Sequence, residues 1–408
     1  ADMTRLRPTS STSPTSPANP TSWRNIALAI LVAVMASFQI GKAIIALPLL
    51  QGDPLHLSLG QTGLVISALA IVGAVLAMPI GVIVSRFDSR RVMLTGLGVI
   101  ALTNVLGSAA SSVSALLATR VLEGIAVVML LVCASSVVGR QAANQDRDLA
   151  MAASSTAVPG GIALVMLVAT LILWLGQPLS WPAIWLVNAA LAILCAIVVW
   201  FAMPSMPAVA SPTTKPGGVL DAVRQVGASR SVQLIAVCFS LYAIVYFAFS
   251  GFLPLLLRDL LGLTRIQAGF VSAGIVASNV LGNLAAGALM RRGVASRSIV
   301  GTGFLIAAVC IPALFWLSLP PVVAVAFAVA LIGCMGGIPG ALTAIAPRVA
   351  PSPALIAPTI GFMLQGSYIG QLVGPMSAGA LAQAGGWSLV AWMLLPLAIA
   401  GALLSRKL

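Results

Sequence analysis

The chain has 408 residues, of which 60% are apolar and only 7% are charged, whereas about 25% of residues are charged in an ordinary soluble domain. This composition excludes a typical soluble enzyme and predicts a polytopic membrane protein whose spans need about 20 apolar residues each. The 21 basic residues that give the net charge of +13 are placed singly or in pairs between apolar segments. We therefore attribute the charge to membrane topology and not to nucleic-acid binding.

The chain opens with a segment rich in Ser, Thr and Pro, residues 1–22, for which we predict a disordered cytoplasmic tail. Twelve apolar stretches follow, at about 24–50, 60–85, 92–111, 113–139, 149–174, 181–203, 231–257, 266–290, 298–318, 321–347, 354–384 and 387–405. We predict helices for them, because a lipid-exposed segment must satisfy its backbone polar groups internally. The expected fold is all-α, with twelve transmembrane helices.

A break rich in Pro and Gly, residues 204–230, divides these stretches six and six. We interpret it as a cytoplasmic linker between an N-terminal six-helix half, 23–203, and a C-terminal six-helix half, 231–408. Two of the 21 basic residues lie inside spans and two in outer loops, which leaves 17 on the side shared by both termini. The positive-inside rule then predicts cytoplasmic termini in a bacterial-type inner membrane.

The two halves match each other without gaps at an offset of 206 residues. The segment 47–50 and the segment 253–256 both read Leu-Pro-Leu-Leu, and Trp181 matches Trp387. One frame that covers several spans indicates two parallel six-helix repeats, which transporters use to place a site between their halves.

The turn between the second and third spans, residues 81–91, carries Gly81, Arg86, Asp88, Arg90 and Arg91. It resembles the loop signature of the major facilitator superfamily, and the resemblance extends over nearly the whole chain after residue 23. It implies that family's two-half fold and alternating access, with these five residues in a conformational loop. Ser85 stands where the family usually has aspartate and Asp88 where it usually has glycine, so the family's charge latch is weakened or shifted to Asp88. Membrane topology alone explains Arg90 and Arg91 equally well.

Three further segments resemble members of that superfamily. Arg120 to Gly124 is similar to the Arg-x-x-x-Gly pattern of proton-coupled members, and residues 39–50 most resemble the cyanate-transporter-like branch. The run Pro159-Gly160-Gly161 partly resembles an antiporter signature. A helix kink or close packing explains this run better than an antiport role does.

Only three charged residues fall at membrane depth, where charge is costly unless it faces a cavity or a partner: Lys42, Arg120 and Glu123. Lys42 and Arg120 lie at similar depths, roughly 12 Å and 10 Å from the outer ends of their helices. We expect them, with Gln39, to bind substrate, and we expect Glu123 to be the coupling proton site. The alternative is a structural Arg120–Glu123 pair with Lys42 reaching outward.

In the second half, Tyr242, Tyr246 and Gln365 are neutral candidates for substrate binding. For the two tyrosines, substrate contact and a structural role are equally well supported. Asn279 and Asn283 share a helix face, and hydrogen bonding between helices explains them better than substrate contact does.

The sequence predicts neither catalytic residues nor a metal site nor a cofactor. It has one histidine, His56, five cysteines without metal-ligand spacing and no phosphate-binding Gly-Lys loop. We expect a monomeric, proton-coupled secondary transporter that moves a small, anionic solute with or against protons across the lipid bilayer, since two cations face one acid. One alternative is a proton-driven exporter of lipophilic drugs, and another is a non-transporting sensor or scaffold.

Overall fold

The computed structural model describes residues 20–408 except 53–54, 85, 144, 208–217 and 353–354, so most of the predicted tail lies outside the described residues. The described part of the chain is helical and contains no β-strand. Its helices are α1 (Trp23–Leu50), α2 (Leu59–Ser67), α3 (Ala70–Val84), α4 (Ser89–Ser108), α5 (Val113–Gln141), α6 (Arg147–Ser155), α7 (Ala157–Trp174), α8 (Trp181–Ala202), α9 (Gly218–Ala228), α10 (Arg230–Leu261), α11 (Arg265–Arg291), α12 (Ser296–Trp316), α13 (Pro321–Met335), α14 (Gly337–Val349), α15 (Ile356–Gly385) and α16 (Trp387–Ser405).

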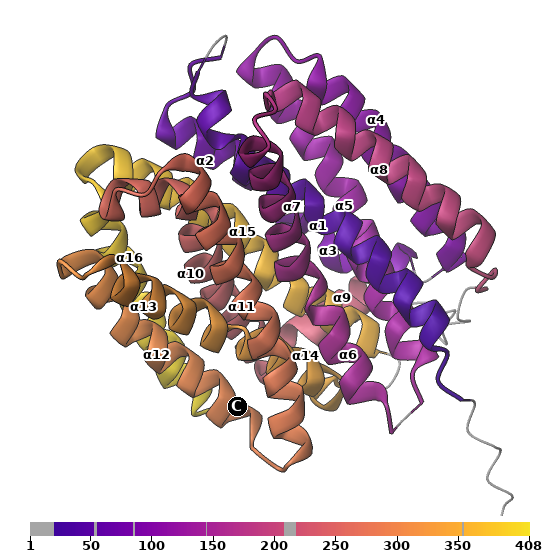
Figure 1. Ribbon diagram of the computed structural model, residues 1–408. Helices are drawn as coiled ribbons and strands as arrows, with labels where there is room; N and C mark the ends of the chain where they lie inside the picture. The colour runs from indigo at the N-terminus through magenta and orange to yellow at the C-terminus, as the bar shows by residue number, and fades with distance from the viewer. Residues whose placement is uncertain (1–19, 53–54, 85, 144, 208–217, 353–354) are drawn as a thin grey trace, which may run out of the picture.

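Two helical halves lie side by side (Figure 1), one built from α1–α8 and the other from α10–α16. They meet where α15 packs along α2 and α3, and where α11 packs against α6 and α7. In the first half, α4 and α8 form an outer pair, and in the second half α12 and α16 do the same. This arrangement puts α1, α7, α10 and α11 near the centre of the molecule.

Eleven of the predicted spans form helices, some of them in two pieces, that are long and apolar enough to cross a membrane within the described part of the chain. The remaining span, predicted at 354–384, forms the 30-residue helix α15, which is not among these eleven. Its sequence is less hydrophobic because it carries six glycines and several Gln and Ser residues. Gly366, Gly370 and Gly374 fall four residues apart against α10, where the backbones approach too closely for larger side chains.

Three of the predicted spans are interrupted. The second is divided between α2 and α3, the fifth between α6 and α7 at Thr156, and the tenth between α13 and α14 at Gly336. At the first break, a Cβ on Gly124 of α5 would lie 2.2 Å from the Leu69 carbonyl oxygen, so only glycine allows this contact. The break is therefore in direct contact with α5, the helix that carries Arg120 and Glu123.

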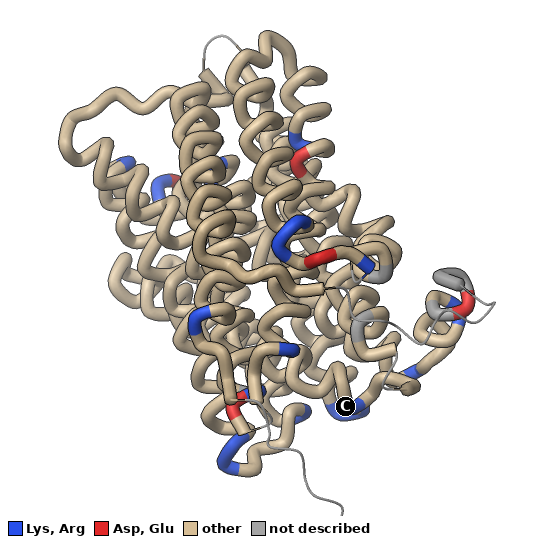
Figure 2. Tube along the Cα trace, turned by 90° about the vertical axis from the view of Figure 1, so that its right-hand side faces the viewer, with Lys and Arg blue, Asp and Glu red and all other residues tan. Residues whose placement is uncertain are grey.

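The start of α1 and the C terminus lie at the same end of the bundle (Figures 1 and 2), and most Lys and Arg residues lie toward that end. Thr21 donates to an Asp146 carboxylate oxygen, and the Ser22 N–H donates to the Gln141 carbonyl at 3.0 Å. These two residues of the predicted tail are thus held against the α5–α6 connection. The predicted linker also differs from expectation, because it contains the helix α9, which packs on α3, α10 and α15.

Candidate functional site

Lys42 lies at the centre of a polar cluster inside the first half. Its ammonium donates to Oε1 of Gln39 at 2.9 Å, to Oδ1 of Asn104 at 2.5 Å and to Oε1 of Glu123 at 2.6 Å. All four side chains are fully buried. Three acceptors require three N–H donors, which the charged form of lysine supplies. Lys42 is therefore held as a cation by side chains from α1, α4 and α5.

Glu123 accepts hydrogen bonds on both carboxylate oxygens, since Nη1 of Arg120 lies 2.8 Å from its Oε2. Arg120 also donates from Nε to the Val65 carbonyl at 3.2 Å, while its Nη2 has no partner among the described residues. The sequence prediction that Arg120 and Glu123 pair is confirmed. The two buried cations Lys42 and Arg120 share the one buried acid Glu123, so the cluster has an excess of one positive charge.

The cluster faces the outer helices of its own half. Lys42 Nζ lies 4.7 Å from the centre of the Trp185 ring on α8, a cation–π contact. Gln39 Nε2 reaches Oδ1 of Asn188 on the same helix at 3.5 Å. The predicted substrate residues Lys42, Arg120 and Gln39 thus lie together, but in this conformation they bind protein groups on α2, α4, α5 and α8.

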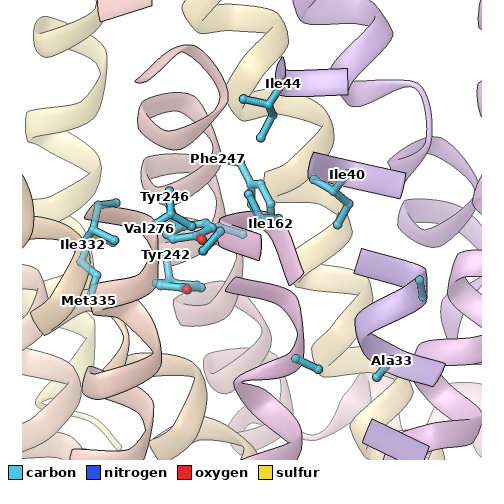
Figure 3. Close-up of a cluster of buried hydrophobic side chains, with 14 of the residues drawn as sticks. Ala33, Ile40, Ile44, Ile162, Tyr242, Tyr246, Phe247, Val276, Ile332 and Met335 are labelled. Carbon is cyan, nitrogen blue, oxygen red and sulfur yellow. The ribbon is translucent and has the colours of Figure 1, made fainter. Parts of the chain in front are cut away.

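The opposite face of α1 is apolar and points toward the second half. Figure 3 shows Ile40 and Ile44 next to Phe247 of α10, with Ile162 of α7 beside them. All four side chains are buried in one hydrophobic cluster. The centre of the molecule between the halves is therefore lined by aliphatic and aromatic groups.

Tyr242 and Tyr246 continue this apolar centre on α10. Their rings stack with centroids 5.5 Å apart, and Figure 3 shows them beside Val276, Ile332 and Met335. Asn279 Nδ2 lies 3.5 Å from the Tyr242 hydroxyl, whereas the buried Tyr246 hydroxyl has no partner among the described residues. An unpartnered buried hydroxyl is unfavourable and is available to a bound solute.

Asn279 and Asn283 make hydrogen bonds between helices, as expected. Asn279 Nδ2 donates to the Ile332 carbonyl of α13 at 2.9 Å. Asn283 accepts a hydrogen bond of 2.8 Å from Ser155 of α6, which joins the two halves.

Gln365, predicted to bind substrate, also joins the halves. Its Nε2 donates to the carbonyls of Ala74 at 2.8 Å and Val75 at 3.2 Å on α3. The i+4 partner of the Val75 carbonyl would be Pro79, which has no N–H. Gln365 therefore satisfies an acceptor that the proline leaves open.

The loop 81–91 is attached to its own half. Asp88 caps α4 by accepting the Arg91 N–H at 3.0 Å, and its other oxygen accepts the Ser205 hydroxyl at 2.7 Å. Burial raises the pKa of the Asp88 carboxyl, but the hydrogen bonds from Ser205 and from nearby backbone N–H groups outweigh it and leave the pKa below its usual value. Within the described part of the chain Asp88 forms hydrogen bonds and no ion pair in this conformation. A role for Asp88 as a charge latch stays a prediction.

Arg90 in the same loop contacts α8. Its guanidinium donates to the Trp200 carbonyl, and its Cζ lies 5.1 Å from the centre of the Trp200 ring. Arg86 lies in the turn after α3, Arg91 lies in the first turn of α4, and both are exposed. Gly81 is buried in α3, where an added Cβ would lie 3.5 Å from the Val132 side chain of α5.

The run Pro159-Gly160-Gly161 lies in the first turns of α7, just after the interruption at Thr156. A Cβ on Gly161 would lie 2.7 Å from the Ser37 side chain of α1, so this glycine permits close packing of α7 on α1. A Cβ on Gly160 would meet Val280 of α11 at 3.6 Å, an ordinary contact across the halves. The geometry fits the packing interpretation.

Three members of the cluster, Asn104, Asn188 and Trp185, were not predicted from the sequence. An isolated amide in an otherwise apolar span is itself a signal, because burying it without a partner is costly. Trp185 carries no such signal, since aromatic residues are common in spans. Among the described residues, no group of three His, Cys, Asp or Glu side chains is placed to hold a metal ion.

The fold and the cluster together define a polytopic membrane protein built from two six-span halves. The family model of the Major Facilitator Superfamily matches residues 29–355, so the chain belongs to that superfamily and is a transporter and not an enzyme.

A solved structure with the same fold is a bacterial homologue of the human lysosomal transporter Spinster, in an inward-facing and unoccupied conformation. The two chains are 20% identical, the match covers 94% of this chain and 97% of the other, and the TM-score is 0.71. No curated protein sequence matches this chain.

Proposed function

We propose that this chain is a proton-coupled secondary transporter that works by alternating access, with Glu123 as the proton site and a lipophilic solute bound between the halves. The observation that carries the proposal is the buried carboxylate of Glu123 held between Lys42 and Arg120. It is the one acid among the described residues that lies fully buried inside a spanning helix.

Protonation of Glu123 would leave two unpaired cations in the protein interior. Each buried, uncompensated charge costs several kcal/mol, so the protonated cluster favours a conformation that admits water or a counter-charge. Deprotonation restores both ion pairs and favours the closed, dry arrangement. This difference between the two states is what couples proton binding to a change of conformation.

The apolar centre between the halves supports a lipophilic solute. Ile40, Ile44, Phe247 and the stacked pair Tyr242 and Tyr246 offer aromatic and aliphatic contacts there, with the Tyr246 hydroxyl as a polar anchor. Sites of this kind, mostly apolar with a few polar groups, are typical for small organic ligands. The charged cluster lies on the opposite side of α1 and serves the proton.

A second candidate is a small anionic solute, as the resemblance to the cyanate-transporter-like branch implies. Two observations favour it: the excess positive charge of the cluster and the unpartnered Nη2 of Arg120. An anion would have to reach Arg120 when the halves separate and replace Glu123 as its partner, which would favour protonation of Glu123.

We further propose that both termini face the cytoplasm of a bacterial-type inner membrane, with a cytoplasmic linker between the halves and the protein as a monomer. The distribution of basic residues toward the end that carries the C terminus supports this orientation. Gln177 after α7 and Gln225 on α9 are both exposed, and the proposed orientation puts Gln177 outside and Gln225 in the cytoplasm. Cysteine at Gln225 should react only with reagents that cross the membrane, whereas cysteine at Gln177 should react from outside.

Transport in proteoliposomes tests the function directly. The purified protein is reconstituted with a pH-sensitive dye inside, and lipophilic cations, neutral lipophiles and small organic acids are added in turn. Solute-dependent proton flux with lipophiles supports the proposal, and flux only with small acids establishes the second candidate. Absence of proton movement with every solute that is transported would show that coupling is not to protons.

A further inference from the structure

The outer helix pairs of the two halves form related grooves that differ at their mouths. The groove between α4 and α8 has a volume of about 280 Å³, and that between α12 and α16 about 510 Å³. Ile193, Ala196 and Ile197 line the first, and their matches at the 206-residue offset, Ile399, Ala402 and Leu403, line the second. Because of the internal repeat, the α12–α16 groove can be compared directly with the α4–α8 groove.

In the first half a cation–π pair lies at the mouth of the groove. Arg90, the second residue of α4, lies over Trp200, the twentieth residue counted from the start of α8. At the 206-residue offset Trp200 corresponds to Arg406, which caps α16. Arg297 matches Arg91 at that offset, but it is the second residue of α12, as Arg90 is the second residue of α4. An arginine thus replaces the tryptophan, and the larger groove opens between two guanidinium groups.

These two arginines are unneutralised. Both are exposed, and neither guanidinium has an ion-pair or hydrogen-bond partner among the described residues. Residues 260–408 contain seven Lys and Arg residues and no Asp or Glu. Residues 260–408 therefore offer no acidic side chain to compensate the mouth of the groove. The acid of the second half, Asp259 on α10, accepts a hydrogen bond from Trp387 at the start of α16, whereas Arg406 follows the end of that helix.

The floor of the groove is suited to an acyl chain. Leu305, Ile399 and Leu403 line it and are 59%, 46% and 54% exposed, so they face the surrounding lipid. Gly301 allows α12 to approach α16, since a Cβ there would lie 2.9 Å from the Ser405 hydroxyl oxygen. Ser298 and Thr302 also line the groove.

We propose that the α12–α16 groove is a binding site for one anionic phospholipid, with its phosphate between Arg297 and Arg406 and an acyl chain along Leu305 and Leu403. Guanidinium groups bind phosphate oxygens through paired, charge-assisted hydrogen bonds. A zwitterionic lipid carries its own cation, which the two arginines repel. In the orientation proposed above the lipid belongs to the cytoplasmic leaflet, but its binding in detergent does not depend on that orientation or on transport.

Native mass spectrometry of the detergent-solubilised protein, titrated with phosphatidylglycerol or phosphatidylcholine, tests the site. We expect one phosphatidylglycerol to bind more tightly than phosphatidylcholine. Arg297→Gln and Arg406→Gln should each weaken its binding roughly fivefold. Arg406→Trp, which copies Trp200 of the first half, should abolish the preference because the ring fills the mouth.

Lys407→Gln is the matched control, because it removes the same charge from the adjacent exposed position outside the groove. It should leave the binding of phosphatidylglycerol unchanged, and thermal unfolding should show that all variants are folded. If Lys407→Gln weakens binding as much as Arg406→Gln, or if Arg406→Trp binds phosphatidylglycerol as tightly as the unaltered protein, general surface charge accounts for the binding and the proposed site is wrong.

Discussion

Arg120 Nε donates a hydrogen bond of 3.2 Å to the carbonyl of Val65, two residues before α2 ends. The last four carbonyls of a helix lack intrahelical partners, so the break between α2 and α3 leaves this acceptor open to a side chain from α5. The same guanidinium holds Glu123. The charge state of the buried acid is thus linked physically to the interruption of the second span.

Glu123→Gln should abolish solute accumulation driven by a pH gradient while leaving solute exchange between equal pools. The substitution removes the titratable group but also leaves Lys42 and Arg120 without a counter-charge, which destabilises the fold by about 3–5 kcal/mol. The double variant Lys42→Gln with Glu123→Gln keeps the excess charge of one, so it should unfold at a higher temperature than Glu123→Gln alone. Transport assays and thermal unfolding on the three proteins measure both effects. Retention of pH-driven accumulation by the double variant would exclude Glu123 as the proton site.

Tyr246→Phe should increase thermal stability by about 1 kcal/mol and weaken solute binding about fivefold to tenfold. The variant removes a buried hydroxyl that has no partner in the described structure, and it also removes the anchor that a solute would use. Tyr368→Phe is the control, because the Tyr368 hydroxyl is likewise buried and unpartnered but its ring packs in a separate cluster on α3 and α5. It should gain stability with unchanged affinity. Equal losses of affinity in both variants would contradict a specific role for Tyr246.

Gly124→Ala should disturb the fold or force α5 away from the break in the second span. Its Cβ would lie 2.2 Å from the Leu69 carbonyl oxygen, a distance that backbone atoms cannot accommodate without moving. Gly274→Ala on α11 has no heavy atom within 4 Å of its new Cβ, and it should stabilise the protein by up to about 1 kcal/mol. Thermal unfolding in detergent compares the two. A Gly124→Ala protein as stable as the Gly274→Ala protein would show that the contact relaxes freely.

Asp88→Ala should destabilise the start of α4 by about 1 kcal/mol at neutral pH, whereas Asp88→Asn retains an acceptor and should cost less. The lowered pKa of Asp88 means that its ionised form stabilises the folded state at pH values above the unfolded carboxyl pKa. That contribution is lost as the pH falls through the lower, folded pKa. Unfolding of the unaltered protein and Asp88→Ala should therefore converge in strong acid. A difference in stability that persists there would assign the effect to packing.

The sequence predicts the spans and the Arg120–Glu123 pair because both follow from local rules. Apolar length defines a span, and residues three apart share a helix face. The interruption at Thr156 was expected only as a kink at Pro159, and those near Leu69 and at Gly336 were not expected. Breaks depend on which carbonyls find partners on other helices, and that is a property of the folded molecule.

The partners of Lys42 were not predictable for a related reason. The depth of Lys42 along α1 follows from counting residues, but its direction around the helix axis depends on how α1 packs against α4 and α8. The interpretation that Lys42 reaches outward differs from the structure, where it donates inward to Asn104 and Glu123. Asn104 is 62 residues from Lys42 in the sequence, Trp185 is 143 residues from Lys42, and Asn188 is 149 residues from Gln39, so only the tertiary fold brings them together.

The Gln365 contact across the halves depends on main-chain carbonyls of α3 and on the proline that frees one of them. The side chains of Ala74 and Val75 play no part in it, so these positions can change during evolution without loss of the contact. If Ala74 and Val75 are replaced in distant relatives, Gln365 and Pro79 are the two residues whose identities show whether the contact is kept. A relative that loses the proline regains an internal N–H for the Val75 carbonyl, and its glutamine is then free for another role.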